Sequence, residues 1–162
     1  KNTDILFIDG TPDTEEDKTG KSFVSAKGNL FDKMLNAINL KKDDIFIVNA
    51  IPWRPPGNRY PTAEEIKICR PFIFNLIKLL KPKIIVCLGE ISTNQILHLN
   101  QSFIKTRGKW HSLKSNPIND FDEEYNPYVL PTLNISYLLT RPDMKRQAWE
   151  DMKLLRDKIR EI

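Results

Sequence analysis

An asparagine ends the apolar stretch IFIV of residues 45–48, and it is the first residue here whose type and place suggest chemistry. The side-chain amide of Asn49 offers one acceptor and two donors in a single plane. Held at the end of a strand, such an amide can pair with a flat amide–imide ring such as the edge of a pyrimidine. The alternative is an asparagine that only caps or turns the chain where a strand ends.

An aromatic ring could complete a site of this kind. Phe23 lies between the first predicted strand and the first predicted helix, in a segment that leads to the same edge of the fold. There its ring could stack on a base, an interaction of roughly 1–3 kcal/mol per stacked base. The alternative is a phenylalanine that fills the core.

Five basic residues fall in predicted loops, and two tryptophans, Trp53 and Trp110, are interleaved with them. Together these side chains could follow a phosphate backbone, and the alternative for each cation is a solvated loop. The basic residues are Arg54, Arg59, Arg107, Lys109 and Arg141. A net charge of +4 and a pI near 9.0 permit a polyanionic partner but do not require one.

The two cysteines do not form a recognisable site by themselves. Cys69 and Cys87 lie 18 positions apart, and neither His98 nor His111 stands at ligand spacing from them. A metal or iron–sulfur centre takes four ligands, so buried apolar thiols are the preferred interpretation. Two cysteines make no disulfide framework either, and we expect a reducing, cytoplasmic setting. No apolar run reaches the roughly 18–20 residues that would span a membrane.

The elements that must position these residues alternate along the chain. Apolar runs predict strands at 4–9, 44–50, 83–88 and 128–133, and amphipathic patterns predict helices from Asn29, Thr62, Ile91 and Pro142. We expect Pro71 to kink or divide the second helix. Because the strands are continuous Val/Ile/Leu runs, the sequence predicts one α/β domain over residues 1–162, a three-layer αβα sandwich with a central four-stranded parallel sheet.

Ligands of such sheets bind beyond the carboxyl ends of the strands, so the residues found there are site candidates. We expect them to converge on one rim of the sheet. They are Asp9, Gly10, Thr11, Pro12 and Asp13 after the first strand, Asn49 after the second, Gly89 and Glu90 after the third, and Asn134 after the fourth.

Four stretches, taken together, resemble the uracil-DNA glycosylases, and most of all the family 4 (thermostable, iron–sulfur) type. The resemblance covers nearly the whole chain, and the segment WRPPGNR with its downstream glutamate and cysteine is its most specific part. In chain order the stretches are DGTPDTEEDKTGKSFVSAKGNLFDKML, VNAIPWRPPGNRYPTAEEIKICRPF, RGKW and LPTLNISYLLTRPDMKRQAWEDMK.

The resemblance implies hydrolysis of the bond between uracil and deoxyribose, with the nucleotide flipped out of DNA, at the start of base excision repair. It implies that Asn49 reads the edge of uracil, that Phe23 stacks on it, and that Asn134 stabilises the departing anion. Gly10 and Thr11 would border the base. Arg54, Arg59, Arg107 and Arg141 would contact DNA, and Leu138 or Leu139 would fill the gap left by the flipped base. The expected partner is uracil-containing DNA, bound by a monomer.

Two motifs depart from the family pattern. The family's G-E-A-P-G is Asp9 to Asp13 here, so Gly10 stands at the glutamate, and Asp9 or Asp13 would have to place the attacking water. The family's H-P-x-Y-L-L begins here with Asn134 and Ile135. Cys69 and Cys87 match two of the four ligands of the family's [4Fe–4S] cluster, which would be complete only with an upstream cysteine pair. A non-catalytic DNA- or uracil-binding relative, and a small-molecule enzyme or structural protein sharing only the fold, therefore stay open as alternatives.

Overall fold

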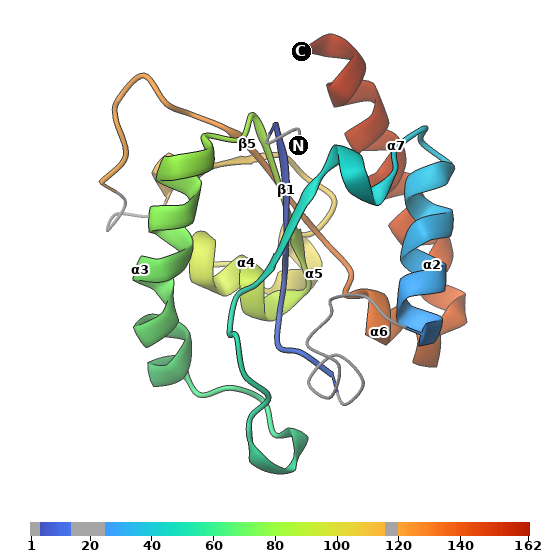
Figure 1. Ribbon diagram of the computed structural model, residues 1–162, viewed down its shortest axis with the longest axis horizontal. Coiled ribbons are helices and arrows are strands. Elements are labelled where there is room, and N and C mark those ends of the chain that lie inside the picture. Colours follow the sequence, from blue (N-terminus) through green and yellow to red (C-terminus); the bar gives the residue numbers. More distant parts are fainter. Residues whose placement is uncertain (1–3, 14–24, 116–119) are drawn as a thin grey trace.

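A central sheet organises the computed structural model, which describes residues 4–13, 25–115 and 120–162 (Figure 1). Its strands lie in the order β2-β1-β3-β5-β4. The first four of that order run parallel, and β4 pairs antiparallel with β5 at the edge. The strands are β1 (Ile5–Asp9), β2 (Phe46–Asn49), β3 (Ile84–Leu88), β4 (His111–Ser112) and β5 (Tyr128–Thr132).

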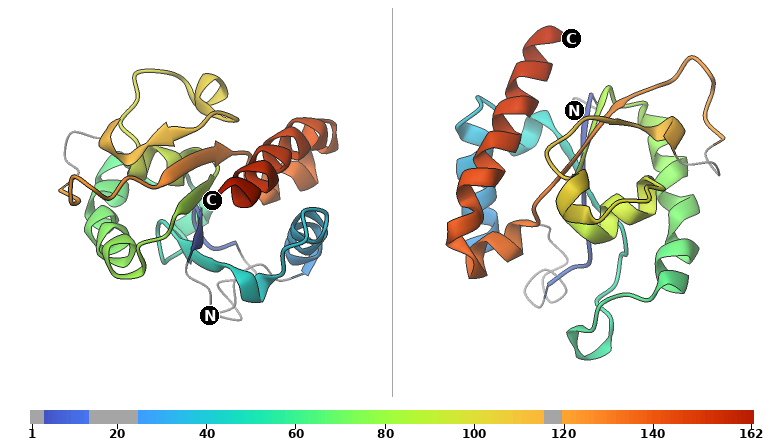
Figure 2. Two further views of the ribbon diagram at one scale, coloured as in Figure 1. Left: turned by 90° about the horizontal axis from the view of Figure 1, so that it is seen from above. Right: turned by 180° about the vertical axis from the view of Figure 1, so that it is seen from behind.

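Helices cover both faces of this sheet (Figure 2). The side chains of α3 and α4 pack on one face, and those of α2, α6 and α7 pack on the other. The α-helices are α2 (Ser25–Asn36), α3 (Ala63–Leu80), α4 (Glu90–Ile96), α5 (Phe103–Thr106), α6 (Ile135–Thr140) and α7 (Lys145–Glu161). Short 3-10 turns are η1 (Lys42–Asp44), η2 (Pro56–Asn58), η3 (Leu113–Ser115) and η4 (Pro142–Met144).

The predicted αβα sandwich is confirmed, but the predicted number of strands is wrong. The described residues form a five-stranded sheet, and the additional strand is the antiparallel β4. Two residues are too few to leave a periodic pattern in the sequence. The preceding Trp110 holds this strand in place, because its ring meets that of Tyr128 on β5 edge-on, with the centroids 6.0 Å apart.

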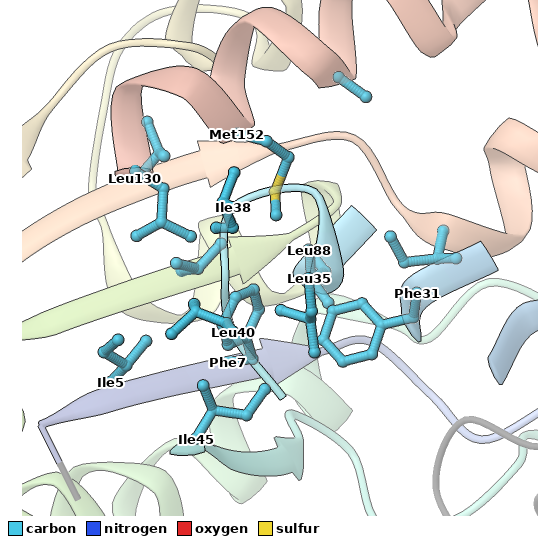
Figure 3. Packing of buried hydrophobic residues seen from close by; sticks show 14 of the residues in the cluster. Ile5, Phe7, Phe31, Leu35, Ile38, Leu40, Ile45, Leu88, Leu130 and Met152 are labelled. Atoms are coloured by element: carbon cyan, nitrogen blue, oxygen red, sulfur yellow. The ribbon is translucent and has the colours of Figure 1, made fainter. Parts of the chain in front are cut away.

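Alternation along the strands divides the core into two layers. On β1, Ile5 and Phe7 face the α2 layer, whereas Leu6 and Ile8 face the α3 layer. Figure 3 shows the first of these clusters, in which the ring of Phe7 meets that of Phe31 from α2 at a centroid distance of 5.3 Å. The same alternation directs the next side chain of β1, the carboxylate of Asp9, toward α2.

Helices α2 and α3 differ from their predicted form, and α7 begins at Lys145, after a 3-10 turn that starts at the predicted Pro142. Helix α2 begins at Ser25, four residues before the predicted cap at Asn29. Helix α3 begins as predicted with a capping box between Thr62 and Glu65, but it runs unbroken through Pro71. The proline side chain is exposed, and water can satisfy the backbone carbonyl that loses its donor on that side. Among the described residues, no helix combines the length and the apolar character needed to cross a membrane.

Candidate active site

A cavity of about 460 Å³ opens at the carboxyl edge of the sheet, the lower edge in Figure 1. Its walls come from the ends of β1, β3 and β5, from α4, α5 and α6, and from the loop before α3. The lining residues are Gly10, Tyr60, Leu88, Gly89, Glu90, Ile91, Phe103, Ile104, Arg107, Leu133, Asn134, Tyr137, Met144 and Gln147. The predicted convergence of strand ends therefore brings Gly10, Gly89, Glu90 and Asn134 together.

A buried polar network lies at the base of this edge. The Nζ atom of Lys27, on α2, is 2.5 Å from Oδ2 of Asp9, and the two side chains are 3% and 1% exposed. The Nδ2 atom of Asn134 donates to Oδ1 of the same carboxylate at 3.0 Å and, more weakly, to the backbone oxygen of Leu88 at 3.4 Å. Both carboxylate oxygens of Asp9 are thus occupied, one by a cation and one by an amide.

Asn134 has a second task, because it caps helix α6. Its Oδ1 atom accepts hydrogen bonds from the backbone N–H groups of Ser136 and Tyr137, at 2.9 and 3.3 Å. Such a cap satisfies donors that the first turn of a helix leaves unpaired. With the oxygen on the helix and the nitrogen on Asp9, the orientation of this amide is fixed.

Asn49 lies one strand away from Asp9. The two residues are register partners on the parallel pair β1–β2, so their side chains leave the same face of the sheet. The backbone N–H of Ile51 donates to the oxygen of Gly10 at 3.2 Å and keeps the two strand exits side by side. Asn49 is half-buried, and no hydrogen bond joins its side chain to another residue that the structure describes. Its planar amide is therefore available to a ligand.

The other residues expected around the base differ in their placement. Gly10 lines the cavity, and a Cβ atom at this position would stand 3.1 Å from Cδ1 of Ile91. Thr11 and Asp13 are half-buried and are not among the residues that line the cavity. Phe23 lies outside the described residues.

Asp9 is buried away from the cavity, which is at odds with a direct role in holding water. The carboxylate that faces the cavity, among the described lining residues, is Glu90 at the start of α4. Partial burial and the negative charge of Glu90 together raise the pKa of Tyr60, another lining residue, to about 12. The position of Glu90 directly after β3 was the available signal in the sequence, whereas nothing there singled out Lys27.

Gly89 brings the end of β3 against Asn134. Its φ of +102° lies in a region that other residues rarely adopt, and an added Cβ would stand 3.0 Å from the Cβ of Asn134. We expect Gly89→Ala to lower the free energy of unfolding by about 1–3 kcal/mol and to displace the amide of Asn134. Urea denaturation measures the first effect, with Gly57→Ala as the matched control, because Gly57 also has a positive φ but nothing within 4 Å. Equal losses in both variants would contradict the predicted contact.

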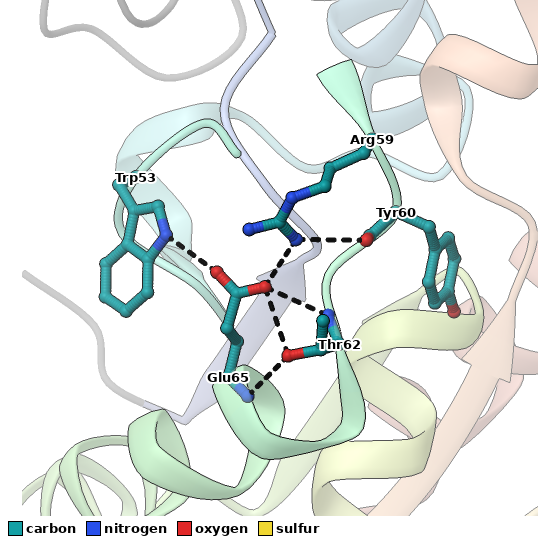
Figure 4. A network of polar contacts seen from close by, with 5 residues as sticks. All are labelled: Trp53, Arg59, Tyr60, Thr62 and Glu65. Carbon is teal, nitrogen blue, oxygen red and sulfur yellow. Dashed lines mark hydrogen bonds and ion pairs between the residues drawn. The ribbon is translucent and has the colours of Figure 1, made fainter. Parts of the chain in front are cut away.

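The loop between β2 and α3 is held by Glu65 (Figure 4). One carboxylate oxygen, Oε1, accepts from Nη1 of Arg59 at 2.5 Å and from the backbone and hydroxyl of Thr62 at 3.0 and 3.2 Å. The other oxygen accepts from the indole N–H of Trp53 at 3.3 Å. These contacts give two residues of the WRPPGNR segment, Trp53 and Arg59, a partner within the protein. Arg59 is also one of the predicted DNA contacts.

This arrangement predicts an acid transition. The hydrogen bond from Arg59, followed by that from the Thr62 backbone, lowers the pKa of Glu65 from 4.5 to about 2. Because the pKa of Glu65 is lower in the folded protein, its ionised carboxylate stabilises the fold. This stabilisation is complete above pH 4.5 and is lost as the pH falls through about 2. We expect the emission of Trp53, taken as the difference between the wild type and Trp53→Phe, to titrate near pH 2. A midpoint near 4.5 would show that the carboxylate is not held by Arg59.

Two further arginines expected at DNA also have partners within the chain. The guanidinium of Arg107 lines the cavity and binds buried Asp151 through Nη2 at 2.8 Å and Nε at 3.3 Å. Arg141 is exposed and forms a two-point contact with Asp143, at 2.9 and 3.0 Å. Arg54 is half-buried. Contact of these side chains with phosphates stays a prediction.

Of the two leucines expected to enter the duplex, only one is exposed. Leu138 is fully buried in the core against the α2 layer, so core packing describes it and insertion into DNA does not. Leu139 is 40% exposed. The helical turn of α6 points the two neighbours in different directions, and the sequence pair LL does not reveal which one faces the core.

The two cysteines do not fit an iron–sulfur cluster on their own. Cys69 and Cys87 are free and buried, and they belong to different hydrophobic clusters. Burial raises the pKa of both thiols, which opposes the thiolate form that a cluster requires. Among the described residues, no three His, Cys, Asp or Glu side chains are grouped to hold a metal ion.

Comparison with known proteins places these features in a family. The model of the "Uracil DNA glycosylase superfamily" matches residues 1–153. A Type-4 uracil-DNA glycosylase of Sulfurisphaera tokodaii is 35% identical over 159 residues, which are 95% of this chain and 69% of the relative.

Two other relatives with the same name agree. The one from Thermotoga maritima is 34% identical over 94% of this chain and 76% of its own length. The one from Saccharolobus solfataricus is 32% identical over 96% of this chain and 71% of its own length. The matched region contains both strand-end amides and the cavity between α4, α5 and α6, and the chain belongs to the uracil-DNA glycosylase superfamily.

Proposed function

We propose that this protein is a uracil-DNA glycosylase, which hydrolyses the N-glycosidic bond of uracil flipped out of DNA and so starts base excision repair. One observation carries the proposal: the planar amide of Asn49, which has no partner among the described residues, stands at the strand edge next to the exit of β1, where Gly10 lines an apolar cavity, in a chain related to Type-4 uracil-DNA glycosylases. A side-chain amide that no described residue engages can take the paired donor and acceptor of a uracil edge.

The reaction needs three functions from the protein. The base must be held out of the stack, which we assign to Asn49 by hydrogen bonding and to Phe23 by stacking. The bond between N1 and C1′ then breaks with its electron pair going to uracil, and donors near the uracil oxygens stabilise the anion. We assign that role to Asn134, whose 3.4 Å bond to Leu88 is weak enough to be exchanged for a ligand oxygen.

The third function is to place the water that attacks C1′. Asp9 and Asp13 are not among the residues that line the cavity, so we assign the water to Glu90, an exposed carboxylate that does line it. We expect Glu90→Gln to lower kcat on the order of 10²-fold, the usual contribution of a general base, with little change in KM. Single-turnover release of uracil measures this, and Asp13→Asn is the matched control. A larger loss in Asp13→Asn would return the role to that residue.

The setting follows from the surface and the thiols. We propose that the partner is DNA containing uracil, because the chain is basic and the cavity mouth carries the exposed apolar side chains of Ile104 and Tyr137. Two free buried cysteines suit a reducing cytoplasm. We further propose that residues 1–162 act as one domain and as a monomer.

Incubation with matched oligonucleotides tests the proposal. Single- and double-stranded oligonucleotides carrying one uracil should yield abasic sites, detected as alkali-labile breaks, and the same strands with thymine should stay intact. An Asn49→Ala protein prepared in parallel is the blank. Uracil release no greater than in this blank would overturn the assignment.

A further inference from the structure

An ion pair at the base of the site has no evident reason to be there if stability alone is considered. Lys27 and Asp9 are both almost completely buried. Burying two charges costs hydration that their attraction rarely exceeds, and well-packed apolar residues of similar size are often as stable. The exposed pairs on the surface of this protein, such as Lys42 with Asp32, carry no such cost.

The carboxylate of Asp9 is the junction of this network. It receives Lys27 on one oxygen and the amide of Asn134 on the other. It is also the register partner of Asn49 on the neighbouring strand. Asp9 is therefore a neighbour of both amides that the proposed function uses, although neither Asp9 nor Lys27 is among the residues that line the cavity.

We propose that Lys27 is a positioning residue of the glycosylase site, which acts through Asp9 to fix the amide of Asn134. This inference rests on the proposed function. The cation keeps Asp9 ionised inside the protein, and the ionised carboxylate accepts a strong, charge-assisted hydrogen bond from Nδ2 of Asn134. Nδ2 is then held in one orientation before uracil arrives, so the amide does not have to reorganise as the anion forms.

Orientation rather than charge is the reason for the effect. The ion pair is neutral as a whole, so its direct field at the departing uracil is small. An amide without the carboxylate can turn over by exchanging its oxygen and nitrogen. In Asn134 the oxygen caps α6 and the nitrogen meets Asp9, and only the Asp9 contact depends on Lys27. Loss of Lys27 should therefore affect the chemical step and not the binding of the base by Asn49.

A purely structural role of Lys27 predicts a different result from a positioning role. A variant in which both charges of the pair are removed distinguishes these two roles. Lys27→Met alone breaks the buried pair and keeps the charge of Asp9, so this variant should unfold at a lower temperature whatever the role of Lys27. In Asp9→Asn/Lys27→Met both charges of the buried pair are removed together, and the melting temperature should recover toward that of the wild type. The fixed acceptor for Asn134 is nevertheless gone, because a neutral amide at position 9 binds it more weakly and in either orientation.

The experiment measures melting temperature, kcat and KM on a uracil-containing oligonucleotide for the wild type, both variants and a control. We expect kcat of the double variant to fall by a factor on the order of 10², the effect of a small misplacement of a reacting group, with KM nearly unchanged. Lys42→Met, which removes the lysine of an exposed pair with α2, should match the wild type in all three quantities.

Each outcome decides between the two roles. A double variant with recovered stability and wild-type kcat would overturn the inference and leave Lys27 as a structural residue. A rise in KM with unchanged kcat would also overturn it, because Lys27 would then act on binding. A wild-type protein that releases no uracil, while its melting temperature shows it to be folded, would instead refute the proposed function and with it this inference.

Discussion

Replacing Asn49 with alanine is expected to lower uracil release by a factor on the order of 10–10², because the edge of the flipped base loses its hydrogen-bonding partner, which costs about 1–3 kcal/mol. The backbone of Asn49 is tied into β2, and no described residue depends on its side chain, so the fold should be unaffected. A loss of activity at constant melting temperature would assign the amide to the substrate. Single-turnover kinetics at saturating enzyme measures it directly.

The control for this prediction is Asn94→Ala. Asn94 is an exposed residue of α4, so the same chemical change is made outside the site. The control should release uracil at the wild-type rate. Comparable losses in the two variants, or an Asn49→Ala protein with undiminished activity, would remove Asn49 from the recognition of the base.

Replacing Asp151 with alanine is expected to cause the largest loss of stability. This carboxylate on α7 is buried and accepts the guanidinium of Arg107 at 2.8 Å and the hydroxyl of Thr132 at 2.6 Å. Its removal leaves the partly buried guanidinium of Arg107 without this counter-charge. Breaking a buried ion pair in this way lowers the free energy of unfolding by about 3–5 kcal/mol. In a chain of this size the melting temperature should fall on the order of 10 °C.

A neighbouring residue on the same helix provides the control. Asp157 is exposed and pairs with adjacent Arg156 at 3.1 Å, so Asp157→Ala should change the free energy of unfolding by less than about 0.5 kcal/mol. Calorimetry or urea denaturation compares the two variants. A small effect in Asp151→Ala would mean that Arg107 and Thr132 find other partners, and that the RGKW segment is not anchored through α7.

The order of the strands and helices could be predicted because short stretches of sequence indicate each element. Buried parallel strands such as Ile84–Leu88 are continuous apolar runs, and the capping box at Thr62 marks the start of α3. The strand β4 and the helix α6 escaped prediction because two and six residues are too few to establish a period. Pro71 was expected to interrupt α3, but the solvent-facing side of a helix tolerates it.

The candidate site was predictable where it depended on strand ends and not where it depended on pairing. Parallel strands end at one edge, so Asn49, Gly10 and Asn134 could be placed together from the sequence. Opposite charges distant in the chain could not be matched in the same way. Lys27 meets Asp9 across 18 positions, and Arg107 meets Asp151 across 44. The sequence shows a cation in a loop but not the carboxylate that already holds it.

Asn134 both caps α6 and binds Asp9, and this limits substitutions toward the family patterns H-P-x-Y-L-L and G-E-A-P-G. A histidine at position 134 would bring an imidazole but would give up the oxygen that caps two N–H groups of α6. A glutamate at position 10 would have to displace Ile91, whose Cδ1 lies 3.1 Å from the first added carbon. Each of these single substitutions should therefore be harmful in isolation, because each disturbs a contact that only a second substitution could restore.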